Sequence, residues 1–497
     1  MDAVSPTNAG YWKKQIENAL LAPIRAMRRE YLPLLMVYFA YGALGLTAVA
    51  ETFWIKQALT WTPAELSALA VWLSLPWTVK MVFGELVDTV SFLGSQRRAY
   101  VFLGASLVAG GFILLAGAAG GWITVLPPDR LYVIAALVTV TGAVIQDVVA
   151  DAMSTEVVPR RNPDGTPRTK AEIDHDLGMV QVLGRLALAF GIFSVAGVSG
   201  WLASWVSYAT VFLCGLAVPL ISVTGALLVR LETGEERRPT DWRILGGGML
   251  FGAFVVAMAF SGFAYNQEVI FVVSMAVVIW MLDRVTQEVD HDTRMRIVYA
   301  GLIIFAFRAT PGVGEGYRWF TIDVLGFDEA FYGTLQQVGA VIAIAGAWLL
   351  SDLITRRPVP QVLLWLTVVG TVLALPTLAL VFQLHTVTER LFGIGARSIA
   401  LFDAAAVSPL DQLGMIPLLT LIAVYAPASH RATWFALMAS LMNMALTAGA
   451  LGTKYLNLIF HVDRGHYANL PALVVTAYVL SLVLPLGAIV LFGRRVR

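Results

Sequence analysis

The sequence has little charge and almost no cysteine. Only 13% of its 497 residues are Asp, Glu, Lys or Arg, and the formal net charge is +1. The single cysteine, Cys214, excludes an internal disulfide. Because phosphate binding requires clustered cations, the small net charge and the lack of a Lys/Arg-rich run argue against a nucleic-acid partner.

The usual signatures of catalysis and cofactor binding are also missing. No Gly-x-x-x-x-Gly-Lys-Ser/Thr loop occurs, so we do not expect ATP to drive this chain. The six histidines show no metal-ligand spacing, and no nucleophile and base stand at a recognisable spacing. We therefore expect neither an enzyme nor a bound cofactor or metal.

Long apolar runs are what the sequence has instead. Hydrophobic residues make up 58% of the chain, and a helix of about 20 apolar residues crosses the hydrocarbon core of a bilayer. The composition therefore predicts an all-α polytopic membrane protein. Fourteen runs are long enough, at 33–57, 65–87, 98–120, 131–157, 177–200, 206–230, 245–262, 267–283, 297–322, 330–352, 359–382, 401–425, 432–456 and 470–492.

These runs divide the chain into four segments. Residues 1–32 form an N-terminal segment whose mixture of aromatic, aliphatic and cationic side chains is suited to a helix lying on the membrane surface. Six spans follow in 33–230, a polar linker with an extra transmembrane hairpin in 231–296, and six more spans in 297–497. The alternative for the hairpin is a re-entrant pair of helices.

Basic residues predict the orientation, because short cytoplasmic connections carry an excess of Lys and Arg. That excess falls in alternate connections, for example at Arg97 and Arg98 and at Arg294 and Arg296, while the intervening connections hold few cations. Both termini are then cytoplasmic. We expect the inner membrane of a bacterium and a monomeric protein.

Two loops at matching places in the two halves carry the same charges. An acid at a helix end is followed by paired arginines, as Asp88 with Arg97 and Arg98, and as Asp352 with Arg356 and Arg357. Two related six-helix halves are typical of the major facilitator superfamily, in which the substrate lies between the halves. We expect these charges to hold the cytoplasmic face shut; the alternative is that they only set topology.

Two carboxylates stand four residues apart in the fourth apolar run. Asp147 and Asp151 share a helix face, and because a carboxylate in hydrocarbon costs about 2.5–3.5 kcal/mol, this face should look into the protein or a water-filled path. Lys80 and Arg185 lie at similar depth and would neutralise and orient an anionic substrate, while Asp147 would exchange a proton. The alternative is a permanent ion cluster that locks the first half together.

The second half offers a further set of polar candidates around an interrupted helix. Arg308 precedes Pro311-Gly312-Val313-Gly314, and broken helices commonly line transport sites. Glu315 and Arg318 follow the break and would bind substrate or only pair with each other. The remaining substrate-binding or coupling candidates are Glu51, Asp411 and Asn443.

Several motifs together resemble the folate-biopterin transporter family of the major facilitator superfamily. They are Pro76-Trp77 with Lys80, Gly84 and Asp88; Asp147 and Asp151-Ala152; Arg308 with Pro311; and Phe435-Ala436-Leu437 with Ser440 and Asn443. The resemblance implies a secondary transporter of an organic anion such as a folate or pterin, working by alternating access with proton coupling.

Two other functions remain open on the same scaffold. One is a muropeptide permease, whose family shares a fourth helix of the type seen here in Gln146, Asp147 and Asp151 and also has an extra central hairpin. The other is an assembly factor for a pigment or light-harvesting complex.

Overall fold

The computed structural model describes residues 27–91, 95, 97–159, 161–162, 164–228, 242–287, 289–355, 359–424 and 431–496. Helices dominate, and these residues contain no β-strand; isolated bridges join Arg161 to Pro167 and Asp463 to His466. The expected surface helix before residue 27 and most of the polar linker after residue 228 lie outside the described residues.

The first half of the chain forms six helical passes, three of them broken. The second begins at a capping box, in which Thr62 and Glu65 satisfy each other's backbone N–H groups, and breaks near Pro76, which cannot donate the helical hydrogen bond. The elements are α2 (Leu32–Ala43), η2 (Leu44–Thr47), α3 (Ala48–Ala58), α4 (Pro63–Thr78), α5 (Lys80–Thr89), α6 (Arg98–Gly120), α7 (Pro128–Glu156), α8 (Lys170–Trp205), α9 (Tyr208–Cys214) and α10 (Ala217–Leu228).

The second half follows a hairpin of two separate helices. Its first pass is interrupted, as expected, between Arg308 and Gly314, where Gly314 adopts a φ of 72° that favours glycine. The elements are α11 (Trp242–Phe260), α12 (Asn266–Thr286), α13 (His291–Arg308), α14 (Gly314–Asp323), α15 (Glu329–Thr355), α16 (Val359–Leu373), α17 (Leu375–Val381), α18 (His385–Phe392), α19 (Ala396–Val424), α20 (Arg431–Phe460) and α21 (Leu470–Phe492).

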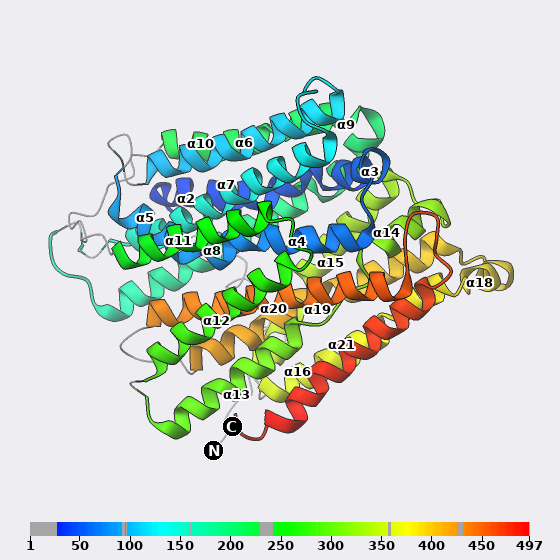
Figure 1. Cartoon of the computed structure of the whole chain (residues 1–497). Helices are drawn as coiled ribbons and strands as arrows, with labels where there is room; N and C mark the ends of the chain where they lie inside the picture. The colour runs from blue at the N-terminus through cyan, green and yellow to red at the C-terminus, as the bar shows by residue number, and fades with distance from the viewer. Residues whose placement is uncertain are drawn as a thin grey trace, which may run out of the picture.

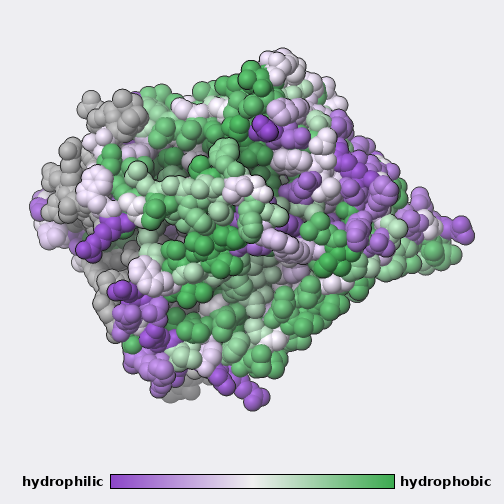
Figure 2. Space-filling view, in the orientation of Figure 1, coloured by the Kyte–Doolittle hydropathy of each residue, from purple (hydrophilic) through white to green (hydrophobic). Residues whose placement is uncertain are grey.

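The described helices confirm a polytopic membrane protein. Ten segments are long and apolar enough to cross a bilayer, or eleven if α18 and the bent start of α19 count as one span. Figure 2 shows a hydrophobic band along the middle of the molecule, with hydrophilic residues toward its two ends. The count of fourteen crossings stays a prediction, although the elements follow the fourteen runs in order.

Each half has its own apolar core. One cluster gathers around Leu34, Val101 and Val149 of the first half, and another around Ile304, Leu363 and Trp434 of the second. The halves meet where α8 packs on α15 and α4 packs on α20. Gly200 and Gly333 make the first contact possible, because a Cβ on either glycine would overlap the backbone of the other helix.

The helices run roughly from one end of the molecule to the other (Figure 1). We call the end that holds residues 59–62, 324–328 and 461–469 the distal end, and the end at which α2 begins and α21 ends the proximal end. The short α18, which the sequence had not indicated, lies at the distal end.

Candidate functional site

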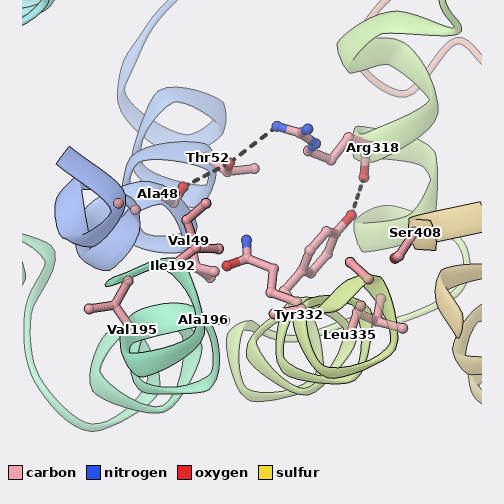
Figure 3. Close-up of a pocket in the computed structure, with 16 residues that line it drawn as sticks. Ala48, Val49, Thr52, Ile192, Val195, Ala196, Arg318, Tyr332, Leu335 and Ser408 are labelled. Carbon is pink, nitrogen blue, oxygen red and sulfur yellow. Dashed lines mark hydrogen bonds between the residues drawn. The ribbon is translucent and has the colours of Figure 1, made fainter. Parts of the chain in front are cut away.

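A cavity of about 590 Å³ lies between the two halves. The first half contributes residues of α2, η2, α3 and α8, and the second contributes α14, α15 and α19 (Figure 3). Small residues keep the space open, among them Gly45, Ala48 and Ala196 facing Gly339 and Ala343. A cavity of this size and position fits a small organic molecule.

A second cavity, of about 430 Å³, adjoins the first. It is lined by α3, α4 and α7 of the first half and by α14 and α20 of the second. Ala48, Thr52 and Arg318 line both cavities, so the two spaces meet at these three residues.

Arg318 is the cation at that junction. Its guanidinium lies 3.1 Å from Glu315 and donates to the Thr52 hydroxyl at 3.4 Å, across the boundary between the halves. The Tyr332 hydroxyl donates to the Arg318 carbonyl oxygen (Figure 3). The Arg318 side chain is 46% exposed and therefore open to the cavities. Glu315 and Arg318 therefore form the ion pair that was one of the two alternatives offered by the sequence analysis.

Glu51 lines the second cavity together with the Glu315–Arg318 pair. The Tyr132 hydroxyl donates to Glu51 Oε1 at 2.7 Å, which fixes one carboxylate oxygen. Thr52, Tyr132 and Tyr332 were not among the sequence-based candidates. Neither periodicity nor charge distinguishes these uncharged side chains from the rest of their helices.

Lys80, Asp147 and Asp151 form an ion cluster, which contains three of the four residues that the sequence analysis grouped together by depth. Lys80 Nζ lies 2.5 Å from Asp147 and 2.6 Å from Asp151, so one ammonium bridges α5 to both acids of α7. The Tyr38 hydroxyl of α2 donates to the other oxygen of Asp151 at 2.9 Å. Arg185 follows Gly184, which packs against the Tyr38 ring, and its side chain is exposed.

The remaining candidates are placed as follows. Arg308 ends α13 and is half-buried, and Asn443 is half-buried in the middle of α20. Neither residue lines either cavity, nor do Lys80, Asp147 or Arg185. Asp411 belongs to α19, but its side chain lies outside the described part of the structure.

At the proximal end, Arg97 links three pieces of the first half. It pairs with Asp88 at 2.9 Å and with Glu156 at 2.5 Å, and it donates to the Val87 carbonyl oxygen. Arg98 lies over the Phe102 ring. Of the matching loop in the second half, Asp352 is described only as a helical residue of α15, and Arg356 and Arg357 lie outside the described residues.

At the distal end, Arg464 of the second half forms hydrogen bonds with the first half. This contact was not predicted from the sequence. From the loop after α20, Arg464 donates to the carbonyl oxygens of Ile55, Lys56 and Trp61, and its guanidinium lies over the Trp319 ring. We call these residues, with Asp323 and Tyr467, the distal clasp.

Asp323 of α14 completes the clasp. Lys56 pairs with one of its oxygens, and the Tyr467 hydroxyl donates to the other at 2.5 Å. Burial, reinforced by the Asp323 carboxylate, raises the pKa of the Tyr467 hydroxyl, so this group remains a donor.

Comparison with solved structures gives the fold. The chain superposes on a crystal structure of a POT family transporter in complex with a thioalcohol-conjugated peptide with a TM-score of 0.65, at 13% identity over 96% of this chain and 100% of that chain. A POT family transporter in complex with 5-aminolevulinic acid gives 0.63, at 13% identity over 94% and 96%. The expected all-α major facilitator fold is confirmed.

Sequence comparison gives the family. A folate-biopterin transporter of Synechocystis sp. is 29% identical over 461 residues, which are 92% of this chain and 80% of the relative. The probable folate-biopterin transporter 4 of Arabidopsis thaliana is 21% identical over 93% of each chain. The sequence model of the BT1 family matches residues 42–496. The chain therefore belongs to the BT1 family and is a multi-pass membrane transporter.

Proposed function

We propose that this protein is a secondary transporter that moves a folate- or pterin-like organic solute by alternating access. The observation that carries the proposal is the junction of two cavities at Arg318, between the halves and lined by polar groups from both. The relatives named as folate-biopterin transporters support the substrate class. In this proposal the 33–230 and 297–497 segments are the two halves that rock, with the hairpin in 231–296 between them.

The distal clasp supports the proposal that the path between the halves is closed at its distal end in this structure. Its hydrogen bonds and ion pair join the end of α3 and the α3–α4 connection of one half to α14 and the 461–469 loop of the other. We propose that the distal side is the outer side, because the expected cytoplasmic connections carry the excess of Lys and Arg, and that these contacts must break before solute enters from it. The proximal end, with both termini, would then face the cytoplasm of a bacterium.

Proton coupling is proposed for the Lys80–Asp147–Asp151 cluster. Two carboxylates share one ammonium. A proton that binds Asp147 would neutralise that carboxylate, so Lys80 would then pair with Asp151 alone. The cluster joins α5 to α7 and, through Tyr38, to α2, so its charge state would bias how these helices pack.

The other predicted residues keep their roles as proposals. Arg185, Arg308, Asp411 and Asn443 would contact solute in a second conformation of the halves, since alternating access changes which side chains line the path. Asp88, Arg97 and Arg98 with Asp352, Arg356 and Arg357 would close the proximal face in the distal-open state. We propose a monomer as the working unit.

Uptake into proteoliposomes tests the proposal. Purified protein should accumulate labelled biopterin or folic acid when the lumen is more alkaline than the outside, and Arg318→Gln should reduce uptake at least tenfold. Arg390→Gln, a change on the exposed surface of α18, is the matched control. Uptake of an anhydro-muropeptide instead, or copurification with a pigment–protein complex without uptake of anything, would overturn the proposal.

A further inference from the structure

We infer that the paired cavities select an uncharged pterin over a folate, which carries two carboxylates on its glutamate tail. This inference rests on the proposed function and narrows its substrate class. It departs from the sequence-based expectation of an organic anion because of the charges that line the two cavities.

The described side chains that line the two cavities carry no net positive charge. Among the described lining residues of both cavities, the charged side chains are Glu51, Glu315 and Arg318. Arg318 is already paired with Glu315 at 3.1 Å. With Glu51 protonated the net charge of the lining is zero, and with Glu51 ionised it is −1. A dianion that leaves water for this site therefore gains no compensating charge.

The other cations of the membrane region do not correct this balance. Lys80 is held by two acids and Lys56 by Asp323. None of Lys56, Lys80, Arg185 and Arg308 lines either cavity. The cations that led to the expectation of an anionic solute are thus outside the space in which a solute fits in this conformation.

A pterin ring matches what the second cavity does provide. The 2-amino-4-oxopteridine edge presents adjacent N–H donors and one carbonyl acceptor without net charge. Glu51 accepts from Tyr132 through Oε1, which leaves Oε2 as an acceptor, and Arg318 has further N–H groups to donate to the ring carbonyl. Leu66, Leu69 and Leu73 supply an apolar wall for the ring face.

A ligand series tests the inference on the wild-type protein. Biopterin carries no carboxylate, pteroic acid one and folic acid two, and all three share the pterin ring. Calorimetric binding to purified protein should weaken in that order, with biopterin at least tenfold tighter than folic acid.

Two variants assign the selection to the proposed residues. Glu51→Gln should weaken biopterin binding at least fivefold, because an amide that keeps the Tyr132 hydrogen bond through its oxygen presents an NH2 donor, and not an acceptor, to the ring donors. Glu315→Gln should strengthen folic acid relative to biopterin, because it frees the Arg318 guanidinium. Glu389→Gln, on the exposed α18, is the matched control, and the thermal transition of each variant checks its folding.

The outcomes separate the two proposals. Folic acid binding as tightly as biopterin or more tightly would overturn the inference and leave the proposed function standing. The same holds if the folded Glu51→Gln and Glu315→Gln variants keep the wild-type preference. Failure of all three ligands to bind or to be transported would overturn both.

Discussion

Arg464 Nη2 donates to the carbonyl oxygen of Trp61 at 3.2 Å, joining two loops 403 residues apart in sequence and belonging to different halves. Further bonds from the same guanidinium reach Ile55 and Lys56 at the end of α3. A cation at a helix C-terminus is favourable, because it lies at the negative end of the helix dipole. One side chain therefore holds several main-chain groups of the opposite half.

Arg464→Ala should favour the distal-open state. Hydrogen bonds from charged donors contribute about 1.5–3 kcal/mol each when buried, so a net shift of about 1.4 kcal/mol, or tenfold in population, is a modest expectation. The measurement is alkylation of Ser67→Cys, a buried site in the second cavity, from the distal side in a Cys214→Ser background. Arg464→Ala should increase the alkylation rate about tenfold, whereas the control Arg390→Ala should leave it unchanged. If alkylation is equally slow in both variants, the clasp does not close the distal path.

Asp147→Asn should separate transport from proton coupling. The variant keeps a side chain of similar size next to Lys80 but can no longer gain and lose a proton. We expect it to keep solute exchange between loaded and external pools and to lose accumulation driven by a pH gradient. Both assays use proteoliposomes, and accumulation at the wild-type level would remove Asp147 from the coupling mechanism.

Lys80→Met should destabilise the first half because it leaves Asp147 and Asp151 without their common cation. Removing one partner of a buried ion pair costs roughly 3–5 kcal/mol, and the partial exposure of this cluster reduces our expectation to about 2 kcal/mol. Thermal melting in detergent provides the measurement. The double variant Lys80→Met with Asp147→Asn should recover part of the loss, and no recovery would argue against direct coupling of the two residues.

The sequence predicted those features that depend on local spacing. Asp147 and Asp151 meet one cation because residues four apart share a helix face, and the pass from 297 to 322 is interrupted between Arg308 and Gly314, where Pro311 cannot donate a helical hydrogen bond. Contacts between distant segments were not predictable in this way. Arg464 appeared only as a loop cation, since nothing near it in sequence indicates the carbonyl groups it reaches.

Helix rotation explains why the side chains that line the cavities differ from those that the sequence analysis selected by depth. Depth along the membrane follows from counting residues, and it grouped Arg308 with the candidates near the middle of the bilayer. Whether a side chain at that depth lines a cavity depends on how its helix is turned, which is set by packing against neighbours. Thr52 and Tyr332 line the cavities for the same reason, and they carry no charge that would have marked them.

Gly200→Ala should impair the contact between the halves. A Cβ at this position would overlap the Glu329 carbonyl oxygen and the Gly333 Cα, so α8 and α15 would have to separate. Overpacking of this kind costs about 1–3 kcal/mol, and we expect both a lower melting temperature and a faster alkylation of Ser67→Cys from the distal side. Gly246→Ala is the control, because a Cβ there meets no atom within 4 Å.

Lys454→Met should loosen the hairpin from the second half. Lys454 of α20 lies 2.7 Å from Glu268 at the start of α12 and also donates to Gln267, while the Tyr455 hydroxyl donates to the same Glu268 oxygen. Both charged side chains are mostly buried, at 13% and 21% exposure, so the variant leaves a carboxylate without its cation at a cost of about 3 kcal/mol. Thermal melting and protease cleavage between α11 and α12 measure the effect. Because Glu268→Gln removes the remaining charge, the double variant should be more stable than Lys454→Met alone; if it is less stable, the pair does not hold the hairpin through its charge.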